Sequence, residues 1–422
     1  MLLNRSVMNL SDYDNLLTLL RNAIDGESRA LPSAPNWQVL TRQARVHGVE
    51  PLVYDAALRL PDEQRPDKAL ATQMKQVCLY QMQQQTLWLP RIKAAVEALR
   101  KADIEPVLLK GFGLADLYPK PYLRSWGDAD IWVGIKNYHA GCKALREAFP
   151  EAIHHDEEYE ELKHYGIVFP DGNAIELHRV AMDFPTPEED AYWQTLEVPA
   201  MSGRIQNSEF SIQKSEVRNQ KSEFRIQKLA LDGLILTPSE PFNILFCFLH
   251  MWEHFCSSGM PLKQVLDIAL LVKRDYLPLS DEQRKIYDDY LRASLKRFSV
   301  LEEWQLVARV VDYVTDVQMP LYDKDFRNQM SDVRNQRFLE RVLQEGQCRV
   351  KEYELGGTDR YDERERVKKL PVWRRKIMTL QGRFADAQFL KQFAPAYARH
   401  VLWANIRKGI RRTIRRERMI DY

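Results

Sequence analysis

The stretch that decides the fold is LLKGFGLADLYPKPYLRSWGDADIWV, residues 108–133 of a chain of 422 residues. Two acidic residues, Asp128 and Asp130, lie near its end in an apolar run that is otherwise typical of a buried strand. Side chains alternate between the two faces of a strand, so the aspartates share one face and Ala129 and Ile131 share the other. The sequence therefore predicts a strand with one apolar, packed face and one acidic face.

A second acidic position follows from a predicted hairpin. The segments 164–169 and 174–180 read as strands, and Pro-Asp-Gly-Asn at 170–173 between them is typical of a hairpin turn. The second strand contains AIELH, in which Glu176 and His178 share one face. If this strand lies beside the strand of the two aspartates, three carboxylates meet on one solvated face.

Three carboxylates on one face are costly without a counter-charge. Two like charges about 4 Å apart repel by about 4 kcal/mol at an effective dielectric constant of about 20. Either one carboxylate takes up a proton or a cation binds. Oxygen ligands suit Mg²⁺, which keeps several waters and shares phosphate oxygens with its substrates. The pattern therefore predicts phosphate chemistry rather than a structural metal.

Four residues of the opening stretch are candidate phosphate ligands. The segment KGFG follows a short strand near 106–110 and opens a helix, so Gly111 and Gly113 would let the backbone approach an anion at a helix start. Lys110 and Arg124 add positive charge beside the same path. For Arg124 the alternative is a structural ion pair with an aspartate.

Changes in residue pattern along the chain divide it into four regions. The predicted fold class is α+β, a small mixed sheet flanked by helical regions. Pro90 predicts a kink or a restart in the long helix before the sheet. The regions are an N-terminal helical region (1–103), an α/β core (104–200), a low-complexity insertion of seven-residue repeats (201–235) and a C-terminal helical domain with a basic tail (236–422).

Bulk composition excludes some classes of protein. Hydrophobic residues make up 45% of the chain, which excludes whole-chain disorder. The net charge is +2, from 61 basic and 59 acidic residues, and favours no class of partner. The five cysteines form no CxxC pair, as expected in a reduced cytoplasmic compartment. No apolar run is long enough to span a bilayer, so we expect a soluble protein. The sequence indicates no oligomeric state.

Two motifs in the C-terminal region are open to more than one interpretation. His250 and His254 lie four residues apart and have zinc-chelating spacing, but without a third ligand in view we expect packed or capping histidines. Asp267 has His254 or Lys263 as candidate partners. The basic stretch 405–418 predicts an amphipathic helix that packs on the protein, with weak binding to an anionic membrane surface or to RNA as the sharper alternative.

The opening stretch followed by AIELH resembles the nucleotidyltransferase fold of the DNA polymerase β-like superfamily. It is most similar to the bacterial family of uncharacterised nucleotidyltransferases. The resemblance extends to LTRQARVHGVEPLVYDAAL upstream and to FLHMWEHF and PLKQVLDIALL downstream, and excludes the repeats. One departure is that Lys110, Gly111 and Phe112 stand where the superfamily usually has a Gly-Ser or Gly-Gly turn.

The resemblance implies a reaction and its residues. Asp128, Asp130 and Glu176 would hold two Mg²⁺ ions, with Mn²⁺ as the alternative, and His178 would hold a carboxylate in place behind them. The enzyme would transfer a nucleoside monophosphate, most simply AMP from ATP, to a hydroxyl acceptor and release pyrophosphate. A small molecule, sugar, protein or RNA end are all open as acceptor. A non-catalytic, antitoxin-like regulator or interaction protein and a phosphohydrolase stay open as alternatives.

Overall fold

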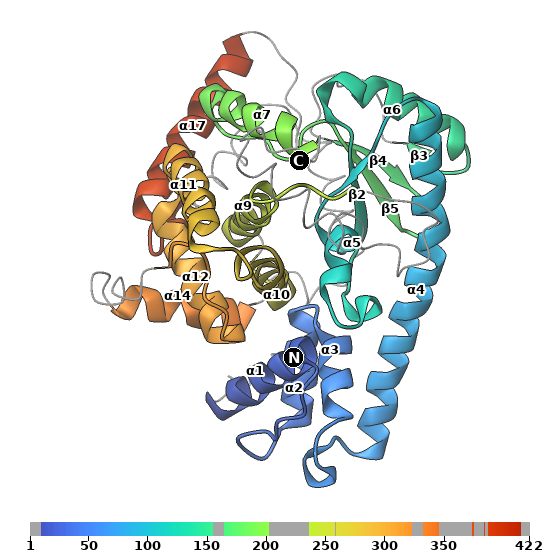
Figure 1. Ribbon diagram of the computed structural model, residues 1–422, viewed down its shortest axis with the longest axis vertical. Coiled ribbons are helices and arrows are strands. Elements are labelled where there is room, and N and C mark those ends of the chain that lie inside the picture. The colour runs from blue at the N-terminus through green and yellow to red at the C-terminus, as the bar shows by residue number, and fades with distance from the viewer. Residues whose placement is uncertain are drawn as a thin grey trace.

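The computed structural model describes residues 10–154, 164–201, 236–257, 259–322, 332–345 and 387–414, together with the single residues Arg374 and Phe384. The predicted repeats, apart from Met201, and the end of the basic stretch therefore lie outside the described residues. The fold is α+β as predicted, a mostly helical molecule built around one five-stranded mixed sheet (Figure 1).

The helices follow the apolar periodicity of the sequence and are capped where a polar side chain precedes them, as at α2, where Asn36 accepts from Val39 N–H. The helices are α1 (Leu10–Asp25), α2 (Trp37–Val46), α3 (Glu50–Ala57), α4 (Lys68–Lys101), α5 (Lys110–Leu114), α6 (Gly134–Ala148), α7 (Pro187–Met201), α9 (Phe242–Ser257), α10 (Leu262–Leu271), α11 (Asp281–Arg297), α12 (Leu301–Thr315), α14 (Asp332–Glu345) and α17 (Pro395–Ile414).

The sheet has the order β1-β2-β5-β4-β3, in which β2 and β5 are parallel and every other pair is antiparallel. The predicted hairpin is confirmed as β4 and β5, and the two-residue edge strand β3 was not predicted. The strands are β1 (Val107–Leu108), β2 (Asp128–Trp132), β3 (Ile153–His154), β4 (His164–Val168) and β5 (Ala174–His178).

The two faces of the sheet meet different partners. Ala129 and Ile131 on β2 are fully buried in a core that includes residues of α4 and α6, as the alternation predicts. On the opposite face Trp132 stacks on Phe242 of α9, with ring centroids 5.8 Å apart. Because Asp128 and Asp130 share that second face, the acidic side of the sheet is turned toward the C-terminal helices.

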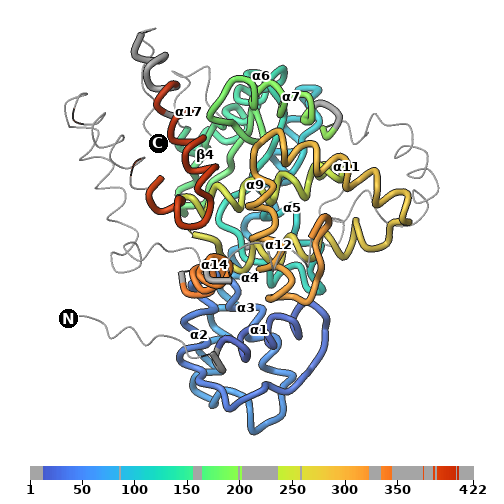
Figure 2. Tube along the Cα trace, turned by 90° about the vertical axis from the view of Figure 1, so that its left-hand side faces the viewer, coloured from blue at the N-terminus to red at the C-terminus, as the bar shows by residue number. Residues whose placement is uncertain are grey.

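The N-terminal helices gather at one end of the molecule (Figure 2). Two of them, α2 and α3, are separated at Gly48, whose φ of 66° lies in the left-handed region. The long helix α4, about 50 Å from end to end, leaves this end and finishes against the sheet. Of the two alternatives predicted for Pro90, the restart is wrong, because α4 continues through this residue as one helix.

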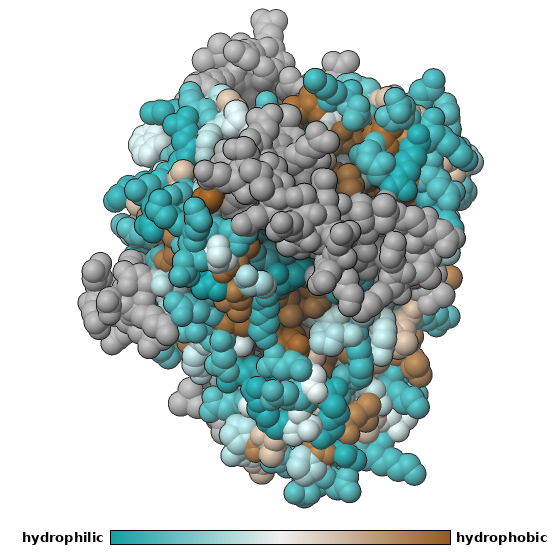
Figure 3. Space-filling model, in the orientation of Figure 1, coloured by the Kyte–Doolittle hydropathy of each residue, from teal (hydrophilic) through white to brown (hydrophobic). Residues whose placement is uncertain are grey.

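The C-terminal helix α17 packs on the body of the protein through residues that precede the basic stretch 405–418, whose own packing stays a prediction. The ring of Tyr397 lies 5.8 Å from that of Trp252 on α9, and His400 Nε2 lies 2.8 Å from Glu189 Oε1 on α7. Among the coloured residues of the face in Figure 3, most are hydrophilic, and apolar residues group near the centre and on the right-hand side. Within the described ranges, no helix combines the length and the apolar character that crossing a bilayer requires.

Candidate functional site

The three predicted carboxylates meet on the acidic face of the sheet. β2 and β5 run parallel with Asp130 directly opposite Glu176, which places Asp128, two residues earlier, on the same face. One carboxylate oxygen from each residue lies within 4.8 Å of the other two. The side chain of Asp130 is 1% exposed and that of Glu176 is 26% exposed, so the group opens to solvent on the Glu176 side.

Asp130 uses only one of its two oxygens. Its Oδ1 accepts from Lys110 Nζ at 3.1 Å and contacts His178 Nε2 at 2.9 Å. Its buried Oδ2 has no hydrogen-bond partner among the residues that the structure describes. A buried carboxylate oxygen without a donor is costly, so this atom is where a bound cation would be stabilising.

Mutual repulsion dominates the electrostatics of the group. The neighbouring Asp130 and, next, burial raise the pKa of Asp128 to about 6. Burial opposes ionisation of Asp130, yet Lys110 and His178 hold its pKa well below the ordinary value. Burial would lower the pKa of Lys110, but the surrounding carboxylates, Asp130 above all, raise it. The group thus carries an excess of negative charge that the ammonium group of Lys110 does not balance.

The donor set fits a hard divalent cation. Asp128, Asp130 and Glu176 offer only oxygen atoms, one of which is buried and has no partner in the part of the chain that the structure describes. Their mutual repulsion falls when a cation binds. Mg²⁺ and Mn²⁺ both take such ligands. These three residues would hold the ion, as the sequence predicted.

The two histidines of α9 complete a chain of polar contacts that begins at the carboxylates. Lys110 Nζ lies 3.0 Å from His250 Nε2, which in turn lies 3.2 Å from His254 Nε2. Lys110 is therefore held between Asp130 of the sheet and helix α9, which follows the sheet in the chain. The two rings pack on each other with centroids 4.4 Å apart, as the packed alternative predicts, and His250 also bonds the lysine beside the acidic group.

Both predicted glycines have a structural reason. Gly111 adopts φ 33° within α5, a conformation that side-chain-bearing residues rarely reach. A Cβ on Gly113 would lie 2.8 Å from Leu108 O, so only glycine lets α5 pack against β1. These constraints place Lys110, at the start of α5, over the acidic face of the sheet. A direct role of the two glycines in phosphate binding stays a prediction.

Arg124 lies apart from the carboxylates, in a buried ion pair. Its Nε and Nη2 lie 3.0 and 2.5 Å from the two carboxylate oxygens of Asp267 on α10, and both side chains are 5% exposed. Tyr118 OH also donates to Asp267 at 2.8 Å. The geometry of Arg124 is therefore that of the structural ion pair with an aspartate, the alternative to phosphate binding. As a correction, Asp267 pairs with Arg124 and not with His254 or Lys263.

Lys263 is a residue of the site that the sequence did not reveal. Its side chain leaves α10 and passes Gly48, where an added Cβ would lie 2.9 Å from Lys263 Cδ. Burial, and next the charge of Arg124, lower its pKa to about 8, and Asp128 acts on it in the opposite direction. In the described parts of the chain we find no hydrogen bond or ion pair for its ammonium group. It is a second cation near the acidic group.

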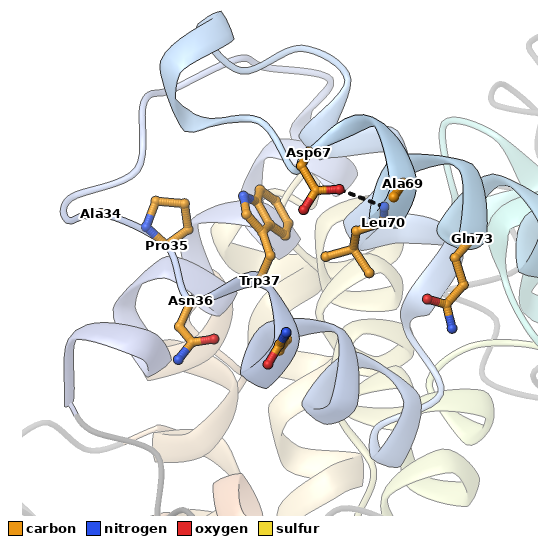
Figure 4. A pocket seen from close by; sticks show the side chains of 9 residues that line it. Ala34, Pro35, Asn36, Trp37, Asp67, Ala69, Leu70 and Gln73 are labelled. Carbon is orange, nitrogen blue, oxygen red and sulfur yellow. Dashed lines mark hydrogen bonds between the residues drawn. The ribbon is translucent and has the colours of Figure 1, made fainter.

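A surface depression of about 760 Å³ lies at the N-terminal end of the molecule, away from the acidic group (Figure 4). It is formed by residues around the starts of α2 and α4, including Trp37 and Asp67. Asp67 accepts from Leu70 N–H and is thereby the N-cap of α4. These groups are used in capping and packing, and the depression has no residue in common with the acidic site.

Comparison with known proteins agrees with this geometry. A sequence profile of the family described as "uncharacterised nucleotidyltransferase" matches residues 33–314, which is more than half of the chain. The match includes β2, β5 and all three carboxylates. No curated protein and no solved structure matches the chain significantly. The extent of the profile match shows that the chain belongs to the uncharacterised nucleotidyltransferase family.

Proposed function

We propose that this protein is a metal-dependent nucleotidyltransferase that moves a nucleoside monophosphate, AMP from ATP in the simplest case, to a hydroxyl acceptor and releases pyrophosphate. The observation that carries the proposal is the in-register pairing of Asp130 with Glu176, which brings both to Asp128 on an open face of the sheet. Family membership supports the same reaction class.

Each residue has a part that follows from its position. Asp128, Asp130 and Glu176 bind Mg²⁺ or Mn²⁺, two ions in the proposed complex. The ions, when bound, neutralise the charge of the triphosphate and of the departing pyrophosphate. His178, 4% exposed and 2.9 Å from Asp130, holds that carboxylate in a fixed rotamer. Fixed carboxylates keep the site ready without reorganisation during the reaction.

Two lysines supply positive charge from outside the sheet. Lys110 is 21% exposed and fixed by Asp130 and His250, so it can add a contact to a phosphate without moving far. Lys263 approaches from α10, and we propose that its ammonium group binds the triphosphate. The ammonium group of Lys263 interacts electrostatically with Asp128 and has no hydrogen bond or ion pair in the described parts of the chain, so it can donate a hydrogen bond to a phosphate oxygen.

The test is nucleotide binding followed by turnover. In a thermal-shift panel of nucleoside triphosphates, we expect a rise in melting temperature only when nucleotide and Mg²⁺ or Mn²⁺ are present together, because a ligand that binds the folded state stabilises it. Asp130→Asn should abolish the shift. No shift with any nucleotide and either metal would end the proposal.

Turnover products separate the alternatives. Pyrophosphate release that depends on an added hydroxyl acceptor supports transfer. Release of inorganic phosphate without acceptor dependence would indicate a phosphohydrolase. Metal-dependent nucleotide binding with no product, across small-molecule, sugar, protein and RNA acceptors, would favour the non-catalytic regulator.

A further inference from the structure

A second group of ligand-type side chains adjoins the carboxylates and contains nitrogen. His164 lies on β4 directly opposite His178 on β5, and Glu176 lies two residues before His178 on the same face. One ligand atom from each of these three residues lies within 4.8 Å of the other two. The group therefore shares Glu176 with the acidic group and adds two imidazoles that the proposed reaction does not need as ligands.

The geometry brackets one carboxylate between two rings. His164 Nε2 lies 3.5 Å from Glu176 Oε1, and His178 Nε2 lies 3.5 Å from Oε2 of the same carboxylate. The ring centroids of the two histidines are 5.2 Å apart. The side chains of His164 and Glu176 are 30% and 26% exposed, so an ion can reach them from solvent, whereas His178 is 4% exposed and fixes the inner wall.

These separations are close to those of a coordination shell. Around an ion with bonds of about 2.1 Å, adjacent ligand atoms lie about 3.0 Å apart in an octahedron and about 3.4 Å apart in a tetrahedron. The two nitrogen–oxygen distances are 3.5 Å, each to a different oxygen of Glu176, and the three ligand atoms lie within 4.8 Å of one another, so a bound ion would draw the side chains together. To ligate an ion, Nε2 of His178 would give up its hydrogen bond to Asp130 Oδ1, 2.9 Å away, and the proton of the ring would move to Nδ1, which has no partner in the described ranges.

We propose that His164, Glu176 and His178 form a second cation site, which binds a borderline divalent transition metal. Zn²⁺ is the metal that this set of ligands suits best. Two imidazoles and one carboxylate with open positions are a ligand set of Zn²⁺ and its neighbours, and imidazole discriminates against Mg²⁺. Glu176 then lies between an oxygen-ligated position and a nitrogen-ligated position.

The competing explanation is a hydrogen-bonded network without metal. His178 Nε2 is 2.9 Å from Asp130 Oδ1, so the imidazole can serve simply as a donor to that carboxylate. His164 would then be a charged neighbour of Glu176. The two explanations differ at His164, because a metal site depends on its nitrogen lone pair, whereas the network explanation gives the imidazole no part in binding a metal.

The probe is Co²⁺, which can occupy Zn²⁺ sites. Co²⁺ absorbs visible light more strongly when it has nitrogen ligands and a low coordination number than when six oxygen ligands surround it. The full-length protein is titrated with Co²⁺ in excess Mg²⁺. We expect about one strongly absorbing Co²⁺ ion to bind per chain, and we expect added Zn²⁺ to displace it. His164→Gln should weaken this binding at least about 100-fold, since even outer partners of metal ligands contribute 10–100-fold. His164→Asp, which keeps a ligand atom, should retain binding with a weaker absorption band.

Matched variants make the titration decisive. His139→Gln changes an exposed histidine on α6, and His254→Gln breaks the other close histidine pair, on α9; neither should alter the signal. Asp128→Asn should also keep the Co²⁺ absorption, so the test of the Co²⁺ site is independent of the test of nucleotidyl transfer. Equal Co²⁺ binding by wild type and a folded His164→Gln variant, or loss only in His254→Gln, would overturn the proposal.

Discussion

Two clusters of charged side chains join the sheet region to the C-terminal helices, and they are built differently. In the closed cluster, Arg124 and Asp267 form a bidentate pair in which both side chains are 5% exposed. In the open cluster, three carboxylates face Lys110 and His178, and a buried oxygen of Asp130 is left without a partner in the described structure.

The difference separates structural from functional charge. The closed cluster has one positive and one negative group, and each is matched by the other's hydrogen bonds, so nothing is gained by adding a ligand. The open cluster is unbalanced and partly solvent-accessible, and Asp128 has its pKa raised to about 6, chiefly by Asp130. Such an excess of like charge lowers the stability of the fold, and it is typical of sites where a bound cation compensates the charge. The following substitutions test this contrast.

The largest effect is expected from removing charge in the open cluster. Asp128→Asn should lower metal-dependent pyrophosphate release by on the order of 10³-fold or more, because it removes a ligand of the proposed ions. The melting temperature of the metal-free protein should stay equal or rise, since a repelling carboxylate is gone. Asp289→Asn on α11, where the side chain is 67% exposed, is the control and should change neither quantity. A clear loss of stability in Asp128→Asn would contradict the contrast.

The closed cluster should respond in the opposite way. Arg124→Met leaves Asp267 buried without its main partner and should lower the free energy of unfolding by about 3–5 kcal/mol, measured by urea denaturation. The double variant Arg124→Met/Asp267→Leu should recover most of this loss, because neither charge is then buried alone. A single variant of wild-type stability that has lost nucleotide binding would instead place Arg124 in the open cluster.

Sequence periodicity predicted the open cluster because its members lie on strands. Alternation placed Asp128 and Asp130 on one face, and the register confirms that Glu176 joins them. His164 was within reach of the same reasoning, since counting outward from the turn at 170–173 pairs it with His178. The two-residue strand β3 is too short to show any periodicity.

The rest depended on tertiary contacts that no local pattern encodes. Lys263 and His250 come from α10 and α9, far along the chain from the sheet, and reach the site only because both helices pack against its acidic side. The partner of Arg124 had the same origin, since Asp267 also lies on α10. Helical propensity of the flanking residues also outweighed Pro90, through which α4 continues.

A buried histidine outside both clusters should set the acid limit of stability. His47 is fully buried; its Nε2–H donates to Leu343 O at 3.0 Å and its Nδ1 accepts from Leu262 N–H at 3.3 Å, so both nitrogens are used by the neutral ring. Burial lowers the pKa of His47 from 6.5 to about 4. Between these values the unfolded state binds more protons than the folded state, so stability is full above pH 6.5 and falls as pH drops toward 4.

This one residue should account for about 3 kcal/mol of the loss over that range. The measurement is urea denaturation at several pH values. His47→Gln, which keeps a donor and an acceptor but cannot titrate, should be less stable at neutral pH and should show a shallower decline toward pH 4. An equal slope in both proteins would show that other groups cause the decline.

Lys263 gives the smallest and most discriminating effect, because it lies near both clusters and is bonded to neither carboxylate group. Lys263→Met keeps the alkyl stem that packs beside Gly48 and removes only the charge. Since burial disfavours that charge, lowering the pKa to about 8, the variant should be at least as stable as wild type. Its affinity for ATP with Mg²⁺ should fall by about 10-fold, the usual scale of one charge-assisted hydrogen bond.

Lys143→Met, on the exposed face of α6, is the control for charge alone. Unchanged affinity would assign Lys263 to packing and leave Lys110 as the lysine of the site.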